Sequence, residues 1–243
     1  MRHGPIKMER IAKRMARFGL CSRREAEKWV RGGRVRVNGL SLIDPATNVT
    51  EECKIHVDGK LLGNPEATRL WRYHKPKGLL TSHRDPQGRP TIFDTLSKSI
   101  PRVVSVGRLD MNSEGLLLLT NDGALARKME LPATGLTRSY RVRVHGFVDK
   151  TALAKLKNGI TIDGLRYGPV EALLDRQVGH NAWLSVALKE GKNREIRNVL
   201  QEIGLRVNRL IRVGYGPFSL GSLSSGATAE ITNFKIESYN FSL

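Results

Sequence analysis

The chain has 243 residues, 40% of them hydrophobic, which is enough for a small domain followed by a larger one with a core of its own. It has no apolar run near the roughly 18 residues of a membrane span, no apolar signal segment at residues 1–5, and only Cys21 and Cys53, so we expect a cytoplasmic monomer without a disulfide framework or a membrane partner. The 41 Lys and Arg residues exceed the 23 Asp and Glu residues, and the net charge of +18 favours a polyanionic partner.

Basic residues concentrate near the N-terminus. Between residues 7 and 36, eleven basic and three acidic residues give a net charge of +8. Ile11, Met15 and Phe18 recur at helical spacing, which predicts a helix whose other face is basic. A merely soluble basic protein is the plain alternative, but a local excess of this size indicates a binding patch.

A second helix and a short β segment follow. Residues 22–25 (Ser-Arg-Arg-Glu) have the pattern of a capping box, which predicts a helix start, and Gly32-Gly33 ends the helix. Residues 34–37 alternate as a strand before the hairpin turn Asn38-Gly39. Residues 55–59 repeat this arrangement with a strand that runs into Asp-Gly.

Two small basic helices and a short β segment form a compact RNA-binding unit. Arg23, Arg24, Arg31, Arg34 and Arg36 are the candidates for its phosphate contacts, and a carbohydrate-like readout of shape is equally open for them. The stretches Ser22–Ala26 and Gly33–Gly39 resemble the S4 RNA-binding domain, and the resemblance covers residues 7–62. By itself this domain implies binding to structured RNA and no particular chemistry. The short polar segment 63–69 is predicted to be a linker.

Residues 70–243 have mostly strand patterns. Buried or half-buried strands are expected at 103–106, 115–120, 140–144, 182–188 and 205–213. Short helices are expected at 124–130, around Leu153 and Leu156 after a cap at Asp149, and at 196–203. Many strands with few helices predict an α+β fold with a mainly antiparallel mixed sheet. No Gly-x-Gly-x-x-Gly or Walker loop is present, and the six histidines are scattered, so neither an organic cofactor nor a metal is expected.

One loop between two apolar strands, residues 107–115, contains Arg108 and Asp110. By its type alone, an aspartate in such a loop is a turn or cap residue, and Arg108 would be a surface ion-pair partner of small energetic value. On pattern alone, Tyr140 is a core or edge aromatic residue of an alternating strand, and Lys192 is a hairpin-turn lysine.

The longer motifs change that reading, because they occur together and in order. They are residues 75–78 (Lys-Pro-Lys-Gly), 85–91, 107–123, 139–142 and 190–197. With the N-terminal unit, the chain resembles the S4-domain-containing ribosomal RNA pseudouridine synthases over nearly its whole length. The stretch 85–94 is most similar to the large-subunit (23S) rRNA enzymes, which modify a hairpin.

The resemblance implies a role for each matching residue. Asp110 matches the essential aspartate, and Arg108 matches the arginine that helps to flip the target nucleotide. Tyr140 matches the tyrosine that stacks on the uracil, and Lys192 matches the basic residue that pairs with the aspartate, with Arg194 and Arg197 as alternatives. RNA contacts are further expected at Lys75, Arg89, Arg194 and Arg197.

The chemistry agrees with these roles. The reaction breaks the N1–C1′ bond of a uridine and rejoins the uracil through C5, so C1′ becomes electron-poor and needs a carboxylate beside it. A covalent C1′ ester and a glycal are both compatible with one aspartate. A nearby cation would keep that carboxylate ionised. The resemblance thus implies an isomerase of rRNA modification and ribosome biogenesis that uses no cofactor.

Two other functions stay open. A non-catalytic ribosome-assembly factor would use the same basic surfaces for RNA binding only, and a related synthase would act on small-subunit rRNA. A protein that acts on DNA or tRNA is a weaker third possibility. In the first two cases the partner is ribosomal RNA or a ribosomal precursor particle.

Overall fold

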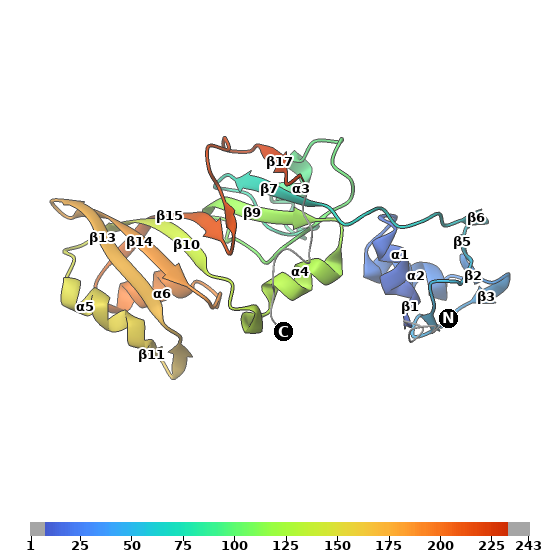
Figure 1. The fold of residues 1–243 in the computed structure, drawn as a ribbon, viewed down its shortest axis with the longest axis horizontal. Coiled ribbons are helices and arrows are strands. Elements are labelled where there is room, and N and C mark those ends of the chain that lie inside the picture. The colour runs from blue at the N-terminus through green and yellow to red at the C-terminus, as the bar shows by residue number, and fades with distance from the viewer. Residues whose placement is uncertain (1–7, 233–243) are drawn as a thin grey trace, which may run out of the picture. The chain divides into compact units, whose positions relative to one another are not determined.

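The structure is a computed structural model that describes residues 8–232 (Figure 1). Residues 1–5, Lys7 at the start of the predicted N-terminal domain, and residues 233–243 at the end of the predicted catalytic domain lie outside the described residues. Two compact units are present. The first runs to Thr68 and includes Ser99–Val103 and Asn121–Gly123, and the second holds the remainder. The limits of 7–62, 63–69 and 70–243 stay a prediction.

The first unit is built from two helices and short strands. Its elements are β1 (Glu9–Arg10), α1 (Ile11–Arg17), α2 (Arg23–Arg31), β2 (Val35–Val37), β3 (Leu40–Leu42), β4 (Asn48–Val49), β5 (Ile55–Val57) and β6 (Lys60–Leu61). Four strands form an antiparallel sheet in the order β3-β2-β5-β6, and β1 pairs with β4. Ile11, Met15, Val30 and Ile55 are buried in its core.

Local sequence signals explain the ends of these elements. The Ser22 hydroxyl accepts from the backbone N–H of Glu25, whose carboxylate accepts in return from the Ser22 N–H, so the predicted capping box is present. The two central residues of the β2–β3 turn, Asn38 and Gly39, both have positive φ, as this type of hairpin turn requires. Asp58 and Gly59, between the paired strands β5 and β6, also have positive φ, so both expected hairpins are confirmed.

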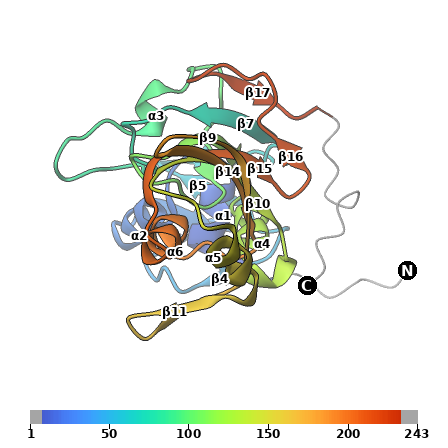
Figure 2. The ribbon, with the colours of Figure 1, turned by 90° about the vertical axis from the view of Figure 1, so that its left-hand side faces the viewer.

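The second unit is organised by one mixed sheet of nine strands (Figures 1 and 2). The order is β13-β14-β10-β15-β9-β7-β17, with β16 added to β15 and β8 to β9. Its strands are β7 (Leu70–Lys75), β8 (Val104–Ser105), β9 (Glu114–Thr120), β10 (Arg138–His145), β13 (Val170–Val178), β14 (Asn181–Leu188), β15 (Arg206–Tyr215), β16 (Phe218–Ser219) and β17 (Thr228–Glu230). Among the strands of residues 8–232, only β15 and β9 pair in parallel, which confirms the expected mainly antiparallel sheet.

Short helices and one separate hairpin complete this unit. They are α3 (Ile92–Thr95), α4 (Gly123–Glu130), η1 (Pro132–Thr134), α5 (Lys150–Lys155), η2 (Leu156–Asn158), α6 (Glu195–Glu202) and the hairpin of β11 (Ile160–Ile162) with β12 (Leu165–Tyr167). Asp149 caps α5 as expected, since its carboxylate accepts from the Thr151 N–H. No helix within residues 8–232 is long and apolar enough to cross a membrane.

The strand expected over 103–106 is shorter than its apolar pattern suggests. Only Val104 and Ser105 pair with β9 as a strand, and Val106 adds one hydrogen bond to the Leu118 carbonyl. Gly107 then turns the chain with φ +67°. This early turn starts the loop that contains Asp110.

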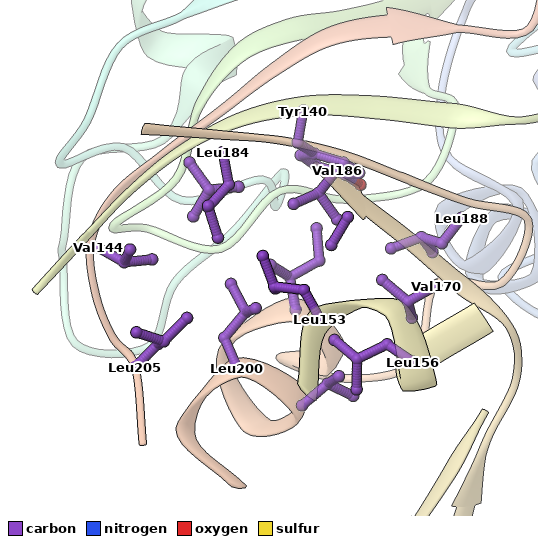
Figure 3. Close-up of a cluster of buried hydrophobic side chains, with 14 of the residues drawn as sticks. Tyr140, Val144, Leu153, Leu156, Val170, Leu184, Val186, Leu188, Leu200 and Leu205 are labelled. Carbon is purple, nitrogen blue, oxygen red and sulfur yellow. The ribbon is translucent and has the colours of Figure 1, made fainter. Parts of the chain in front are cut away.

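Two apolar clusters lie within the second unit. The first packs one face of β10, β13, β14 and β15 against α5 and α6, and Figure 3 shows Leu153 and Leu200 of these helices below Val144 and Leu184 of the sheet. The second joins β7 and β9 to α4 and includes Tyr215. Tyr140 of β10 belongs to the first cluster and Tyr215 of β15 to the second, so the two clusters meet where these neighbouring strands pair.

Candidate active site

The loop between β8 and β9 is anchored on both sides of Asp110. Before the aspartate, the Thr81 hydroxyl donates to the Leu109 carbonyl at 2.9 Å. After it, the Ser113 N–H donates to the Asp110 carbonyl at 3.0 Å. Leu109 is itself buried, so the backbone around the aspartate is held in one position.

The buried side chain of Lys75 holds the same loop through hydrogen bonds to its backbone. Its ammonium group donates to the carbonyls of Pro76 at 2.9 Å and Ser113 at 3.0 Å, and more weakly to that of Met111 at 3.4 Å. Burial lowers the pKa of Lys75 to about 8, and the charge of Asp110 opposes this shift. The side chain is fully buried, so the expected RNA contact of Lys75 is wrong. This lysine instead ties β7 to the aspartate loop.

Gly115 explains why the motif has a glycine after Ser-Glu. It has φ +102°, and a Cβ atom built on it would lie 2.2 Å from the Arg212 carbonyl oxygen and 2.7 Å from the Arg212 nitrogen. Gly115 stands opposite Arg212 in the parallel pair of β9 and β15. Only glycine permits this approach. The pair brings the aspartate loop, which leads into β9, next to β15.

A β-bulge in β15 changes which side chains share a face. Along the β10–β15 pair, the bulge places Val213 as an extra residue, so that Arg212 lies opposite Tyr140 and Tyr215 lies opposite Arg138. Side chains alternate along a strand, and an extra residue resets that alternation. Arg212 and Tyr215 therefore both line one cavity although they are three positions apart.

That cavity has a volume of about 530 Å³ and brings distant segments together. It is lined by Gly107, Arg108, Leu109, Asp110, Ser113, Glu130, Arg138, Tyr140, Leu188, Gly191, Lys192, Asn193, Arg194, Glu195, Ile196, Leu210, Arg212 and Tyr215. The four residues expected to be catalytic, Arg108, Asp110, Tyr140 and Lys192, are thus gathered around one space. Arg108 is exposed, Asp110 is half-buried, and Tyr140 is buried.

The expected ion pair of Asp110 is absent from the described residues. The Lys192 ammonium donates to the Glu190 carboxylate and to the Arg166 carbonyl, each at 2.7 Å. The Lys192 hydrogen bond is the main reason why the pKa of Glu190 is lowered. Among residues 8–232, neither Lys192 nor Arg194 forms an ion pair with Asp110, so this expectation is corrected. A carboxylate two positions away competes for the lysine.

The two arginines at the start of α6 differ in environment. Arg194 is exposed, lines the cavity and caps the helix with φ 50°. Arg197 is half-buried and donates to the carbonyls of Asn112 at 3.1 Å and Val207 at 3.2 Å. Burial and the charge of Arg194 lower the pKa of Arg197, whereas Asp110 raises it. Arg197 therefore joins the aspartate loop to β15.

Sequence reasoning missed three buried charged residues in the cavity wall, namely Arg138, Glu195 and Arg212. Arg138 donates to the Lys189 carbonyl and, at 3.1 Å, to the Tyr215 hydroxyl. Burial raises the pKa of Glu195. For Arg212 there was a signal, since an arginine at an inward position of the apolar strand 205–213 is unusual.

The remaining expected RNA contacts lie outside this cavity. The side chains of Arg23, Arg24, Arg31, Arg34, Arg36 and Arg89 are all exposed. Arg34 stacks on Trp29 and is paired with Asp58, and Arg89 is paired with Asp85. Arg89 is the main reason why the pKa of Asp85 falls to about 2. RNA binding by all of these arginines stays a prediction.

Comparison with known proteins shows which families the chain is similar to. Residues 69–202 match the family model of RNA pseudouridylate synthase, and residues 9–53 match the S4 domain. A protein of Rickettsia felis described as an uncharacterized RNA pseudouridine synthase is 48% identical over 230 residues, which are 95% of this chain and 100% of that protein. Ribosomal large subunit pseudouridine synthase B of Yersinia pestis is 42% identical over 221 residues, 87% of this chain and 69% of that protein.

A crystal structure of a pseudouridylate synthase agrees in fold, with a TM-score of 0.64 and 26% identity over 92% of this chain and 96% of that one. Together these matches define the class of the chain as an RNA-modifying isomerase. The chain belongs to the RNA pseudouridylate synthase family and carries an N-terminal S4 domain.

Proposed function

We propose that this enzyme converts one specific uridine of ribosomal RNA to pseudouridine, in a hairpin of large-subunit (23S) rRNA, with Asp110 as the catalytic carboxylate. The observation that carries the proposal is the shared cavity of Asp110, Tyr140, Arg108 and Lys192. The large-subunit target is supported by the name of the relative from Yersinia pestis. A cavity of about 530 Å³ is within the range that suits small-molecule ligands, and a flipped-out nucleoside is of that class.

Asp110 would act on the sugar carbon of the flipped uridine. When the N1–C1′ bond breaks, its electron pair stays on the uracil and C1′ becomes electron-poor. The Asp110 carboxylate then either bonds to C1′ as an ester or removes a proton from C2′ to give a glycal. The uracil turns and C5 bonds to C1′. In the ester route C5 displaces the Asp110 carboxylate from C1′, and in the glycal route Asp110 returns its proton to C2′. In both routes C5 then loses its proton and N1 gains one, so atoms and electrons balance.

The surrounding side chains fit the binding of a flipped nucleotide. Removing a uridine from its stack costs a few kcal/mol, which basic contacts and an inserted side chain can offset. Exposed Arg108, two residues before the aspartate, is placed to take the position of the base. Tyr140 presents an aromatic ring in the cavity wall for the uracil. Lys192 would reach Asp110 only after leaving Glu190.

The S4 domain would hold the surrounding RNA through its exposed arginines. Arg23, Arg24 and Arg36 form no ion pair with another residue of the described chain. Their charges are therefore open to phosphates. Ribosomal RNA, free or in a precursor particle in the cytoplasm, is the partner that this proposal implies.

Tritium release from C5-labelled uridine in rRNA tests the proposal. We expect release with the wild-type protein and background release with Asp110→Asn. Asp163→Asn is the matched control, because Asp163 lies in the β11–β12 turn with φ 47°, which asparagine tolerates. Unchanged release by Asp110→Asn would exclude the role of Asp110. Release from small-subunit but not large-subunit transcripts would move the target to the smaller rRNA.

A further inference from the structure

Arg212 is a buried cation in the cavity wall with an incomplete set of partners. Only 3% of its surface is exposed, and its Nε donates to the Leu116 carbonyl at 2.7 Å. Its other two nitrogens have no hydrogen-bond partner in the described part of the chain, and Nη2 is fully buried. No carboxylate of residues 8–232 forms an ion pair with it.

A buried cation with free donors destabilises the fold unless a ligand accepts hydrogen bonds from it. A buried charge without a counter-charge destabilises the fold, and each buried donor without a hydrogen-bond partner destabilises it further. Neighbouring Arg138 shows that an arginine can be satisfied here, since it donates to three backbone carbonyls and to the Tyr215 hydroxyl. Arg212 thus has donor capacity left for a ligand in the cavity.

The position of Arg212 points to the base of the nucleotide. Arg212 lies opposite Tyr140 in the β10–β15 pair, and Leu188, Ile196 and Leu210 form an apolar wall around the same space. Exposed Arg108 and Arg194 also line the cavity. They are available to the phosphates of the RNA, because these charged groups stay hydrated at the protein surface. The side chain of Arg212 is far more buried, where the flat and partly apolar uracil would enter.

We propose that Arg212 forms an anion site for the uracil, in which its guanidinium binds the carbonyl oxygen that gains negative charge as the N1–C1′ bond breaks. The inference rests on the proposed function and adds a further catalytic residue to it. Asp110 would act on the sugar and Arg212 on the leaving base, from opposite ends of the bond. A fixed donor aimed at developing charge acts on the transition state and hardly on the bound substrate.

The variants Arg212→Gln and Arg212→Lys test this in single-turnover reactions with a saturating rRNA hairpin. Loss of one such donor slows an enzyme by about 10²–10³-fold, and we expect this loss with Arg212→Gln and a smaller one with Arg212→Lys. The affinity for the RNA should change by less than about twofold, since little ground-state binding is lost. Arg206→Gln is the control, because it removes the same charge from an exposed position of the same strand.

A second substrate keeps the test valid even if the variant is only partly folded. Fluorine at C5 stabilises the uracil anion, so a 5-fluorouridine hairpin depends less on a cation. The rate of glycosidic-bond cleavage with 5-fluorouridine relative to uridine should therefore rise in Arg212→Gln, and this ratio does not depend on the active fraction. An unchanged ratio, or an unchanged uridine rate, would overturn the proposal.

Two other outcomes are distinguishable. In the first, Arg212→Gln binds RNA more weakly and with a shallower salt dependence, and its cleavage rate falls equally with uridine and 5-fluorouridine. This result would assign Arg212 to a phosphate and refute the site for the uracil. If the wild-type protein makes no pseudouridine, the proposed function itself fails. An active wild-type enzyme with an equally active Arg212→Gln contradicts only the inference about Arg212.

Discussion

Replacing Gly115 by alanine should destabilise the second unit, because this glycine permits the close contact of β9 and β15. An added Cβ would lie 2.2 Å from the Arg212 carbonyl oxygen and 3.0 Å from its carbon, both of them backbone atoms that cannot rotate away. Separating the strands costs about 1–3 kcal/mol, as in other overpacked sites. An alanine at φ +102° adds about 1–3 kcal/mol of backbone strain.

The sum of about 2–6 kcal/mol corresponds to a fall of about 5–20 °C in Tm for a unit of this size. Differential scanning calorimetry measures it, and Gly123→Ala is the control, since Gly123 has open space around its Cβ and an ordinary φ at the start of α4. The pseudouridine rate should fall as well, because the aspartate loop and Arg212 lose their common anchor. An active Gly115→Ala protein with the Tm of the wild type would refute this reasoning.

Two further predictions concern the lysines near the aspartate. The pKa of Lys75 is about 8 in the folded protein, against 10.5 for an ordinary lysine. Between pH 8 and 10.5 the unfolded chain therefore binds more protons than the folded one. The free energy of unfolding should rise by about 3 kcal/mol over this interval. Lys75→Met should remove this rise in denaturation series from pH 7 to 10.5, and exposed Lys77→Met should keep it. Lys192→Met should lower kcat by about 10²-fold if the lysine assists Asp110, whereas Glu190→Gln, which frees it, should leave kcat equal or higher. An equal loss in both Lys192→Met and Glu190→Gln would mean that the ion pair of these residues, rather than free Lys192, supports activity.

The elements of the fold were largely predictable because their signals are local. The capping box at Ser22, the Asn38-Gly39 turn and the cap at Asp149 each depend on atoms within a few residues, and all three are present. The strand over 103–106 was overestimated, because its apolar residues extend one position beyond the paired residues Val104 and Ser105 on each side.

The amino-acid sequence by itself determined the class of protein, the loop with Asp110 and the basic character of both units. Only the tertiary structure decided which lysine and arginine side chains line the cavity and which groups they contact. Lys75 is a buried support of the loop, Lys192 pairs with Glu190, and a bulge at Val213 puts Tyr215 on the same face as Arg212. Strand register and burial depend on residues far apart in the chain, so local patterns do not fix them. The choice of Lys192 between nearby Glu190 and distant Asp110 likewise depends on how the chain folds.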